Sequence, residues 1–230
     1  MIKLYEVKGK TPTQIENGAY YRCFGNVELA QILSRVQSLI IKNGYELERM
    51  VTDMTADRHI VDLDNFLSHQ IMSTGTLLVT KSVIKKCRAI QGYGIEPDFI
   101  VFQRIESSQI CYVVELKDGH EFDTKSSAKE HANLRQFVTT NANPLRYFQI
   151  YTKIVGFNAQ SQEEIRIGFK NKIDQDQAMT GKEFCDLLEL NYEEILDTRA
   201  KDRETNFNQL VKELIEIPKV QGFVKSELNI

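Results

Sequence analysis

Three charged residues, Asp98, Glu115 and Lys117, stand at the ends of two neighbouring apolar runs. Both runs are typical of strands, and a short polar turn joins them. Because residues i and i+2 of a strand lie on one face, Glu115 and Lys117 project together, and closing the hairpin brings Asp98 near them. Two close carboxylates repel unless a cation lies between them, and hard oxygen ligands suit Mg²⁺. The spacing therefore predicts a metal-dependent site for phosphodiester chemistry.

The same residues carry a resemblance to a known family. Pro97-Asp98, followed seventeen residues after the aspartate by Glu115-Leu116-Lys117, resembles the motif of the PD-(D/E)xK nuclease superfamily. Within that superfamily the chain is most similar to bacterial type II restriction endonucleases. The likeness covers residues 90–157, where the two halves of the motif lie at the start and the end of adjacent apolar strands and a helix follows.

The resemblance implies a type II site-specific deoxyribonuclease, which cuts double-stranded DNA at a specific sequence and leaves 5′-phosphates. Asp98 and Glu115 would hold one or two Mg²⁺ ions, with the carbonyl of Leu116 as a further ligand, and Lys117 would assist the attacking water. A homodimer acting on a palindrome is implied as well. Such an enzyme would need a companion DNA methyltransferase in the bacterial cytoplasm, which protects the DNA of the host.

Six further side chains are candidates for contacts with DNA. Four cations lie just before the first strand and could form a phosphate-contact surface, although an exposed, solvated face explains them equally well: Lys81, Lys85, Lys86 and Arg88. The other two candidates, His120 and Lys125, follow the second strand, in a loop expected to lead toward the substrate.

An additional acid could join the metal ligands from an early helix, as happens in some relatives. Glu28 and Glu48 are the two candidates. A charge that suits the positive end of a helix dipole, or simply the surface, is the more ordinary interpretation of both.

The surrounding elements are predicted from periodicity and capping signals. Apolar residues on both faces of the strand that opens at Asp98 and of the strand at 110–116 require a sheet that is covered on each side. Two capping boxes, Ser127 with Glu130 and Thr180 with Glu183, predict helix starts. The remaining predictions are a strand at 1–7, a helix from Asn26 to Asn43-Gly44, helices at 47–54 and 62–72, a strand or helix at 76–90, strands at 146–157 and 164–169, and helices at 192–199 and 204–216, ended by Pro218.

Together these elements predict one α/β domain over residues 1–230. The resemblance implies a restriction-endonuclease-like core, in which a mixed central β-sheet is flanked by helices on both faces, with extra N- and C-terminal helices. The catalytic core is expected at about residues 90–170, the N-terminal helical part at 1–75 and the C-terminal helical part at 180–218.

Composition argues against a membrane-spanning protein and against a disulfide or zinc framework, and it does not decide whether the chain binds DNA. The net charge of −3 neither favours nor excludes DNA binding, because affinity depends on the cationic face that meets phosphate. No apolar run approaches the roughly 20 residues that span a membrane. The four cysteines form no CxxC pair and are expected to be reduced thiols rather than disulfides or zinc ligands: Cys23, Cys87, Cys111 and Cys185.

Two alternative functions remain open. A repair or recombination nuclease of the same superfamily would share the chemistry but recognise DNA structure or a mismatch. A DNA-binding module on a disabled nuclease fold would bind without cutting, although the presence of Asp98, Glu115 and Lys117 argues against it.

Overall fold

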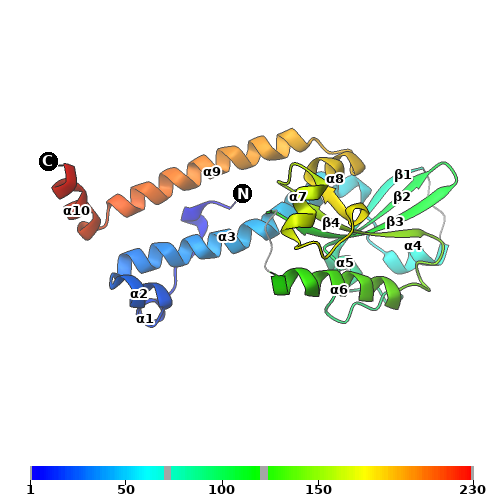
Figure 1. Ribbon diagram of the computed structural model, residues 1–230, viewed down its shortest axis with the longest axis horizontal. Helices are drawn as coiled ribbons and strands as arrows, with labels where there is room; N and C mark the ends of the chain where they lie inside the picture. The colour runs from blue at the N-terminus through cyan, green and yellow to red at the C-terminus, as the bar shows by residue number, and fades with distance from the viewer. Residues whose placement is uncertain (1, 70–73, 120–123, 229–230) are drawn as a thin grey trace. The chain divides into compact units, whose positions relative to one another are not determined.

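The computed structural model describes residues 2–69, 74–119 and 124–228, the last range without the side chains of 124–127. Two compact units can be distinguished, unit 1 with Met1–Leu47 and Glu193–Ile230 and unit 2 with Glu48–Tyr192. The predicted catalytic core falls within unit 2, while a single domain over residues 1–230 remains a prediction. The elements are labelled in Figure 1 and run η1 Leu4–Glu6, α1 Pro12–Glu16, α2 Ala19–Phe24, α3 Val27–Met54, η2 Ala56–Arg58, α4 Leu63–His69, β1 Gly75–Thr80, α5 Lys81–Ile84, β2 Phe99–Ile105, β3 Ser108–Lys117, α6 Thr124–Thr140, β4 Gln149–Gly156, α7 Gln162–Gly168, η3 Gln175–Gln177, β5 Ala178–Thr180, α8 Gly181–Leu187, α9 Tyr192–Ile215 and α10 Pro218–Leu228.

Unit 2 is built on a five-stranded mixed sheet in the order β1-β2-β3-β4-β5. The strands β1, β2 and β3 pair antiparallel, whereas β4 runs parallel to β3 and β5 runs parallel to β4. Strand β2 is apolar on both faces, with four successive buried residues from Phe99 to Phe102. The predicted β2–β3 hairpin and the strand predicted at 146–157 are confirmed.

Helices cover both faces of this sheet (Figure 1). On one face, Ile100 of β2 joins a buried cluster that includes Leu67 of α4 and Phe137 of α6. On the other face, Phe184 of α8 packs against Phe99 of β2, with ring centroids 6.2 Å apart. The predicted α/β architecture, a mixed sheet between helices with further N- and C-terminal helices, is confirmed.

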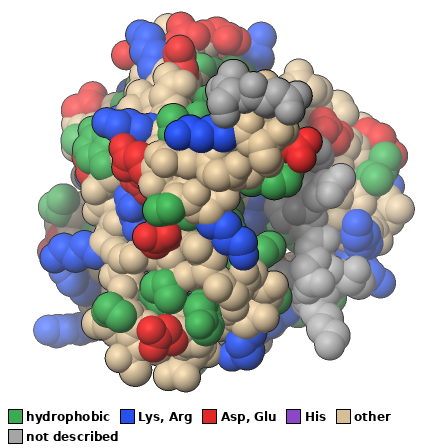
Figure 2. All heavy atoms as spheres, turned by 90° about the vertical axis from the view of Figure 1, so that its left-hand side faces the viewer, with side chains coloured by type: hydrophobic (Ala, Val, Ile, Leu, Met, Phe, Trp, Pro, Cys, Tyr) green, Lys and Arg blue, Asp and Glu red, His purple; other side chains and the backbone are tan. Residues whose placement is uncertain are grey.

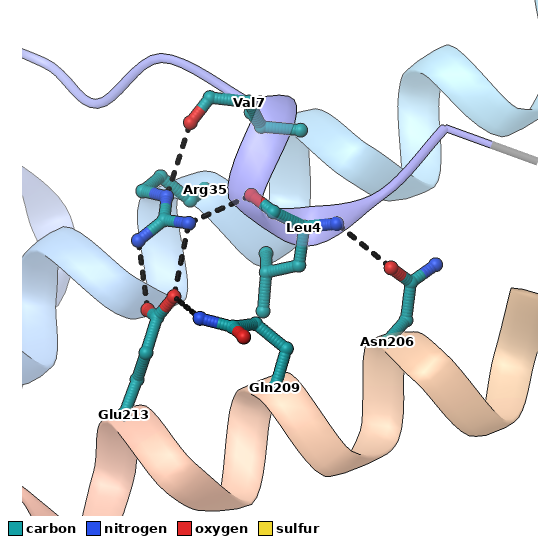
Figure 3. Close-up of polar contacts among 6 residues, drawn as sticks. All are labelled: Leu4, Val7, Arg35, Asn206, Gln209 and Glu213. Atoms are coloured by element: carbon teal, nitrogen blue, oxygen red, sulfur yellow. Dashed lines mark hydrogen bonds and ion pairs between the residues drawn. The ribbon is translucent and has the colours of Figure 1, made fainter.

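In unit 1 the N-terminal turn η1 is tied to α3 and α9 by polar contacts (Figure 3). The guanidinium of Arg35 donates to both carboxylate oxygens of Glu213, at 2.7 and 3.1 Å, and to the carbonyls of Leu4 and Val7. The Asn206 side chain accepts the N–H of Leu4 at 2.7 Å. The strand predicted at 1–7 is wrong, because side chains rather than a neighbouring strand satisfy this backbone.

Helix α3 continues past the break predicted at Asn43-Gly44. Leu39, Asn43, Leu47 and Val51 are all buried, and their four-residue spacing places them on one helix face. A glycine inside a helix costs about 1 kcal/mol relative to alanine. Burying Leu47 and Val51 outweighs that cost, since one fully buried aliphatic side chain contributes about 1.5–3 kcal/mol. The separate helix predicted at 47–54 is therefore the end of α3.

Two predictions about the middle of the chain are wrong. The strand predicted at 164–169 is helix α7, whose N-cap Ser161 accepts the N–H of Glu164 at 3.2 Å. The helix predicted to start at Ser127 starts at Thr124, so the supposed capping box lies inside α6. The segment 76–90 begins with strand β1 and continues into the short helix α5. The helix predicted at 62–72 is α4, and its last predicted residues lie outside the described ranges.

The C-terminal helices also differ from their predicted bounds. The two helices predicted at 192–199 and 204–216 form one continuous helix, α9. Pro218 begins the next helix, α10, which was not predicted. A proline suits that first position because its missing N–H would have no helical acceptor there. The capping box of Thr180 and Glu183 is confirmed at the start of α8.

Two predictions from composition can be compared with the structure. All four cysteines are free thiols, as expected, and only Cys23 is exposed. Over the described part of the chain, no helix is both long enough and apolar enough to cross a membrane.

Candidate active site

The pairing register of the sheet aligns three charged residues in one row. Across β1, β2 and β3 the register places three buried apolar partners side by side, Val79, Ile100 and Val113. Side chains two residues apart along a strand share a face. Two residues away from these positions, toward the same end of the three strands, the register aligns Lys81, Asp98 and Glu115. These three residues and Lys117 are called the row below. Lys117 follows one step further on β3, so all four side chains belong to the face that α6 covers.

Asp98 is buried, with 5% of its side chain exposed, and both of its oxygens accept hydrogen bonds. Oδ2 accepts the backbone N–H of Leu116 at 2.9 Å, and Oδ1 accepts from Lys81 Nζ at 2.9 Å. The backbone N–H of Lys81 also donates to the carbonyl of Asp98 at 3.1 Å. The predicted closure of the hairpin, which brings Asp98 to the end of β3, is confirmed.

Lys117 lies between two carboxylates. Its Nζ is 2.8 Å from Glu115 Oε1 and 2.8 Å from Glu130 Oε1 on α6. The sequence predicts Glu130 as half of a capping box and gives no sign of this contact with Lys117. Only the position of α6 over the sheet brings Glu130 to Lys117, and no local pattern in the sequence signals that.

Burial and like charges make this site unfavourable for negative charge. Burial raises the pKa of Glu115, the negative charge of Asp98 raises it further, and Lys117 opposes both effects. Burial alone would lower the pKa of Lys117, but the carboxylates of Glu115 and Glu130 outweigh it and the pKa is raised. A raised pKa favours the ammonium form of Lys117.

Glu48, near the end of α3, is a third acid close to this row. Its pKa is raised to about 7, first by burial and then by the negative charges of Asp98 and Glu115, while Lys81 and Lys117 lower it. Of the two early acids considered from the sequence, Glu48 belongs to unit 2 with the row, and Glu28 belongs to unit 1.

A cavity of about 270 Å³ adjoins the row. It is lined by Lys81 and Glu115 from the row and by Lys129, Glu130 and Asn133 from α6. One water occupies about 30 Å³ in the liquid. The cavity therefore has room for a phosphate group with several waters, directly beside the carboxylates.

The predicted DNA contacts fall into three groups. Lys85, Lys86 and Arg88 are exposed, as a phosphate-contact surface requires. Lys81 differs from its neighbours because its Nζ is bound to Asp98. His120 lies outside the described residues, and so does the side chain of Lys125, whose backbone lies in the first turn of α6.

The side chains of the row suit a magnesium ion that keeps part of its water shell, rather than an ion held by protein ligands alone. In the described ranges, no group of three or more His, Cys, Asp or Glu side chains is arranged to hold a metal by itself. Magnesium does not need one, because it usually takes one or two carboxylates and keeps several waters. Asp98 and Glu115 provide two carboxylates whose mutual repulsion a cation between them would relieve.

A mixed five-stranded sheet with helices on both faces is consistent with a restriction-endonuclease-like α/β fold. The chain is 40% identical over 215 residues to the type II restriction enzyme HhaII of Haemophilus parahaemolyticus, and the match covers 91% of this chain and 93% of that enzyme. The chain therefore belongs to the type II restriction enzymes, a family of site-specific deoxyribonucleases. No protein-family model matches the chain, and no solved structure matches it.

Proposed function

We propose that this restriction enzyme cleaves double-stranded DNA in a Mg²⁺-dependent reaction that leaves 5′-phosphates. One observation carries the proposal: Asp98, Glu115 and Lys117 share one face at the end of the β2–β3 hairpin, beside a cavity lined by Glu115. The match to a restriction enzyme over nearly the whole chain supports the choice of DNA as the substrate.

Each residue of the row then has a distinct role. Asp98 and Glu115 would hold Mg²⁺, which when bound supplies Lewis-acid polarisation of the phosphate and a more acidic water. The N–H of Leu116 fixes the orientation of the Asp98 carboxylate, which favours a preorganised ligand. Lys117, kept charged by Glu115 and Glu130, orients the attacking water and offsets the negative charge that develops on the phosphate oxygens.

The active form is a homodimer in this proposal. The described residues of one chain supply one such row, and a duplex has two strands to cut. Two copies related by a two-fold axis would place one site on each strand of a palindrome.

Unit 1 offers the surface for a second copy. Among the described residues, eleven of the sixteen exposed large hydrophobic side chains belong to unit 1, so its surface is the more apolar of the two. Figure 2 shows such side chains among charged ones on one face of the molecule. Phe207, Val211 and Ile215 form a stripe on α9, and Phe24 and Phe223 line an apolar groove beside α10. Val224 and Leu228 add to this exposed apolar surface, and a standard interface buries about 800 Å² per partner.

A companion methyltransferase completes the proposal. An enzyme that cuts every unprotected copy of its site would also cut the chromosome of the bacterial cell that makes it. We therefore expect a DNA methyltransferase that modifies the same sequence, and both enzymes would work in the cytoplasm, where that DNA lies.

The proposal is tested with the wild-type protein and the Asp98→Ala variant on plasmid and phage DNA. With Mg²⁺ the wild type should give discrete fragments whose sequenced ends carry 5′-phosphates, and EDTA should abolish them. Asp98→Ala should give no fragments, because a metal ligand is gone, yet it should still shift DNA in a gel.

Other outcomes would favour the alternatives. Cleavage of branched or mismatched duplex only would favour a repair nuclease, and DNA binding without any Mg²⁺-dependent cleavage would favour a disabled module. If Asp98→Ala cut at the wild-type rate, the assignment of the metal site would be wrong.

A further inference from the structure

The sheet fixes the backbone of Lys81 next to Asp98. It follows the last residue of β1, and its N–H donates to the carbonyl of Asp98 at 3.1 Å, which extends the β1–β2 ladder by one step. Its side chain therefore starts beside Asp98 on the face of the row. Only the flexible four-carbon stem can move the ammonium toward or away from the carboxylate.

Lys81 Nζ and the backbone N–H of Leu116 together bind both oxygens of the Asp98 carboxylate. Leu116 N–H occupies Oδ2, and Lys81 Nζ occupies Oδ1 at 2.9 Å. A carboxylate with 5% exposure is costly unless it is paired, so this ion pair stabilises a charge that the fold buries. A divalent ion bound at Oδ1 would repel an ammonium on the same oxygen, so the two cations compete for this atom.

The ammonium groups of Lys81 and Lys117 differ in how easily each can move away from its carboxylate partners. Lys117 is bound by two carboxylates, Glu115 and Glu130, and 24% of its side chain is exposed. Among the described residues Lys81 forms its ion pair with Asp98, 39% of its side chain is exposed, and it lines the cavity of about 270 Å³. Within the described part of the chain, Lys81 has one carboxylate contact to break where Lys117 has two, and it lies beside the cavity.

We propose that Lys81 is an internal substitute for the metal ion: it holds Asp98 in the metal-free enzyme and withdraws into the cavity when a divalent ion binds. This inference rests on the proposed function, because it needs Asp98 to be a metal ligand. It also gives Lys81 a second use, since the withdrawn ammonium lies in the cavity proposed for the DNA phosphate. Lys81 is thus a positioning residue that competes with the metal.

The competition is measurable with Mn²⁺ alone, without DNA and without turnover. Free Mn²⁺ is counted by electron paramagnetic resonance during titration of the wild type, Lys81→Met, Lys85→Met and Asp98→Ala. Lys81→Met should bind Mn²⁺ about 10- to 100-fold more tightly than the wild type, the range that a charge-assisted hydrogen bond corresponds to. Lys85→Met, a matched change at an exposed lysine of the same segment, should match the wild type. Asp98→Ala should lose the binding.

Thermal unfolding supplies an independent measurement. Metal-free Lys81→Met should melt below the wild type, because Asp98 loses its counter-ion, and saturating Mn²⁺ should remove the difference. Lys81→Arg keeps a cation and the fold, so it should bind Mn²⁺ no more tightly than the wild type. A purely structural lysine would lower the melting temperature with and without metal and would not tighten Mn²⁺ binding.

The possible failures are distinguishable. If Lys81→Met bound Mn²⁺ no more tightly than the wild type while Asp98→Ala lost binding, the role of Lys81 would be wrong and the metal site would stand. If Lys81→Arg tightened binding as much as Lys81→Met, competition by the cation would be excluded. If Asp98→Ala bound Mn²⁺ as the wild type does, the metal site and this inference would both be wrong.

Discussion

At the scale of single residues, Lys117 depends on two carboxylates that come from different elements. Glu115 precedes it on β3 and Glu130 reaches it from α6, and both contacts are 2.8 Å long. We predict that Lys117→Met lowers the cleavage rate by about 10²- to 10³-fold, the usual loss when one preorganised donor to a transition state is removed. Single-turnover cleavage of a plasmid that carries the recognition site measures the rate.

Lys129→Met is the matched control, since Lys129 lines the same cavity from α6 without being part of the row. Its rate should stay within about tenfold of the wild type, as expected for a contact that binds phosphate rather than the transition state. Equal losses for Lys117→Met and Lys129→Met would show that only the summed positive charge of the cavity matters.

Glu48 provides a second test at this scale. Its pKa of about 7 reflects burial together with the charges of Asp98 and Glu115, which means that it lies within their electrostatic range. We predict that Glu48→Gln raises the Mg²⁺ concentration for half-maximal cleavage by about tenfold, because removing one nearby negative charge weakens the attraction of the site for a cation. Magnesium titrations of the cleavage rate measure this.

Glu28→Gln makes the same chemical change at the first turn of the same helix, in unit 1. Its magnesium dependence should match the wild type. A wild-type magnesium requirement in Glu48→Gln would exclude Glu48 from the metal site and leave Asp98 and Glu115 unaffected.

At the scale of elements, the start of α8 packs unusually close to the end of β4. A Cβ atom built at Gly181 would lie 2.1 Å from the carbonyl oxygen of Phe157, a distance that no alanine can adopt without backbone movement. We predict that Gly181→Ala lowers the free energy of unfolding by about 2–3 kcal/mol, at the upper end of typical overpacking costs. Urea denaturation measures the change.

Gly222→Ala is the control for this substitution. Gly222 lies inside α10 with no atom within 4 Å of a built Cβ, so alanine should stabilise that helix by up to about 1 kcal/mol. Unchanged stability in Gly181→Ala would mean that α8 and β4 can separate at little cost.

What the sequence could predict depends on how local the determining contacts are. The register of the β2–β3 hairpin places Asp98 beside Glu115. The alternation of side chains along these two adjacent strands is enough to predict that the two carboxylates lie close together. Lys81 and Glu130 reach the site from β1 and α6, through the arrangement of the whole sheet and its covering helix. A sequence pattern cannot distinguish an exposed lysine from one that neutralises a buried carboxylate, so it predicts the same role for Lys81 as for its exposed neighbours.

The errors in secondary structure have a similar origin. The apolar alternation of residues 164–169 is short, and a short run suits a strand as well as a helix. The N-cap at Ser161, with Glu163 and Glu164 in the first turn, decides for a helix. In α3 the local signal of Asn43-Gly44 predicts a helix end, which is wrong because the burial of Leu47 and Val51 outweighs the cost of the glycine.

At the scale of the whole molecule, the proposed function gives the described part of each chain one catalytic site for a duplex of two strands. Unit 1 carries the exposed apolar surface proposed to contact a second copy. We predict that the wild type sediments as a dimer of twice 26.5 kDa. The double variant Phe207→Glu/Phe223→Glu should sediment as a 26.5 kDa monomer, because two charges per copy would have to be buried in the interface.

The double variant should differ from the wild type in DNA cleavage as well as in molecular mass. A monomer presents one site to the duplex at a time, so the double variant should convert supercoiled plasmid mainly to the nicked form, with linearisation slowed more than tenfold at equal chain concentration. Ile105→Glu is the control, since it changes a similarly exposed hydrophobic side chain of unit 2 and should leave the protein dimeric. If Ile105→Glu produced the monomer and the double variant stayed a dimer, the interface would belong to unit 2, and the apolar surface of unit 1 would need another partner.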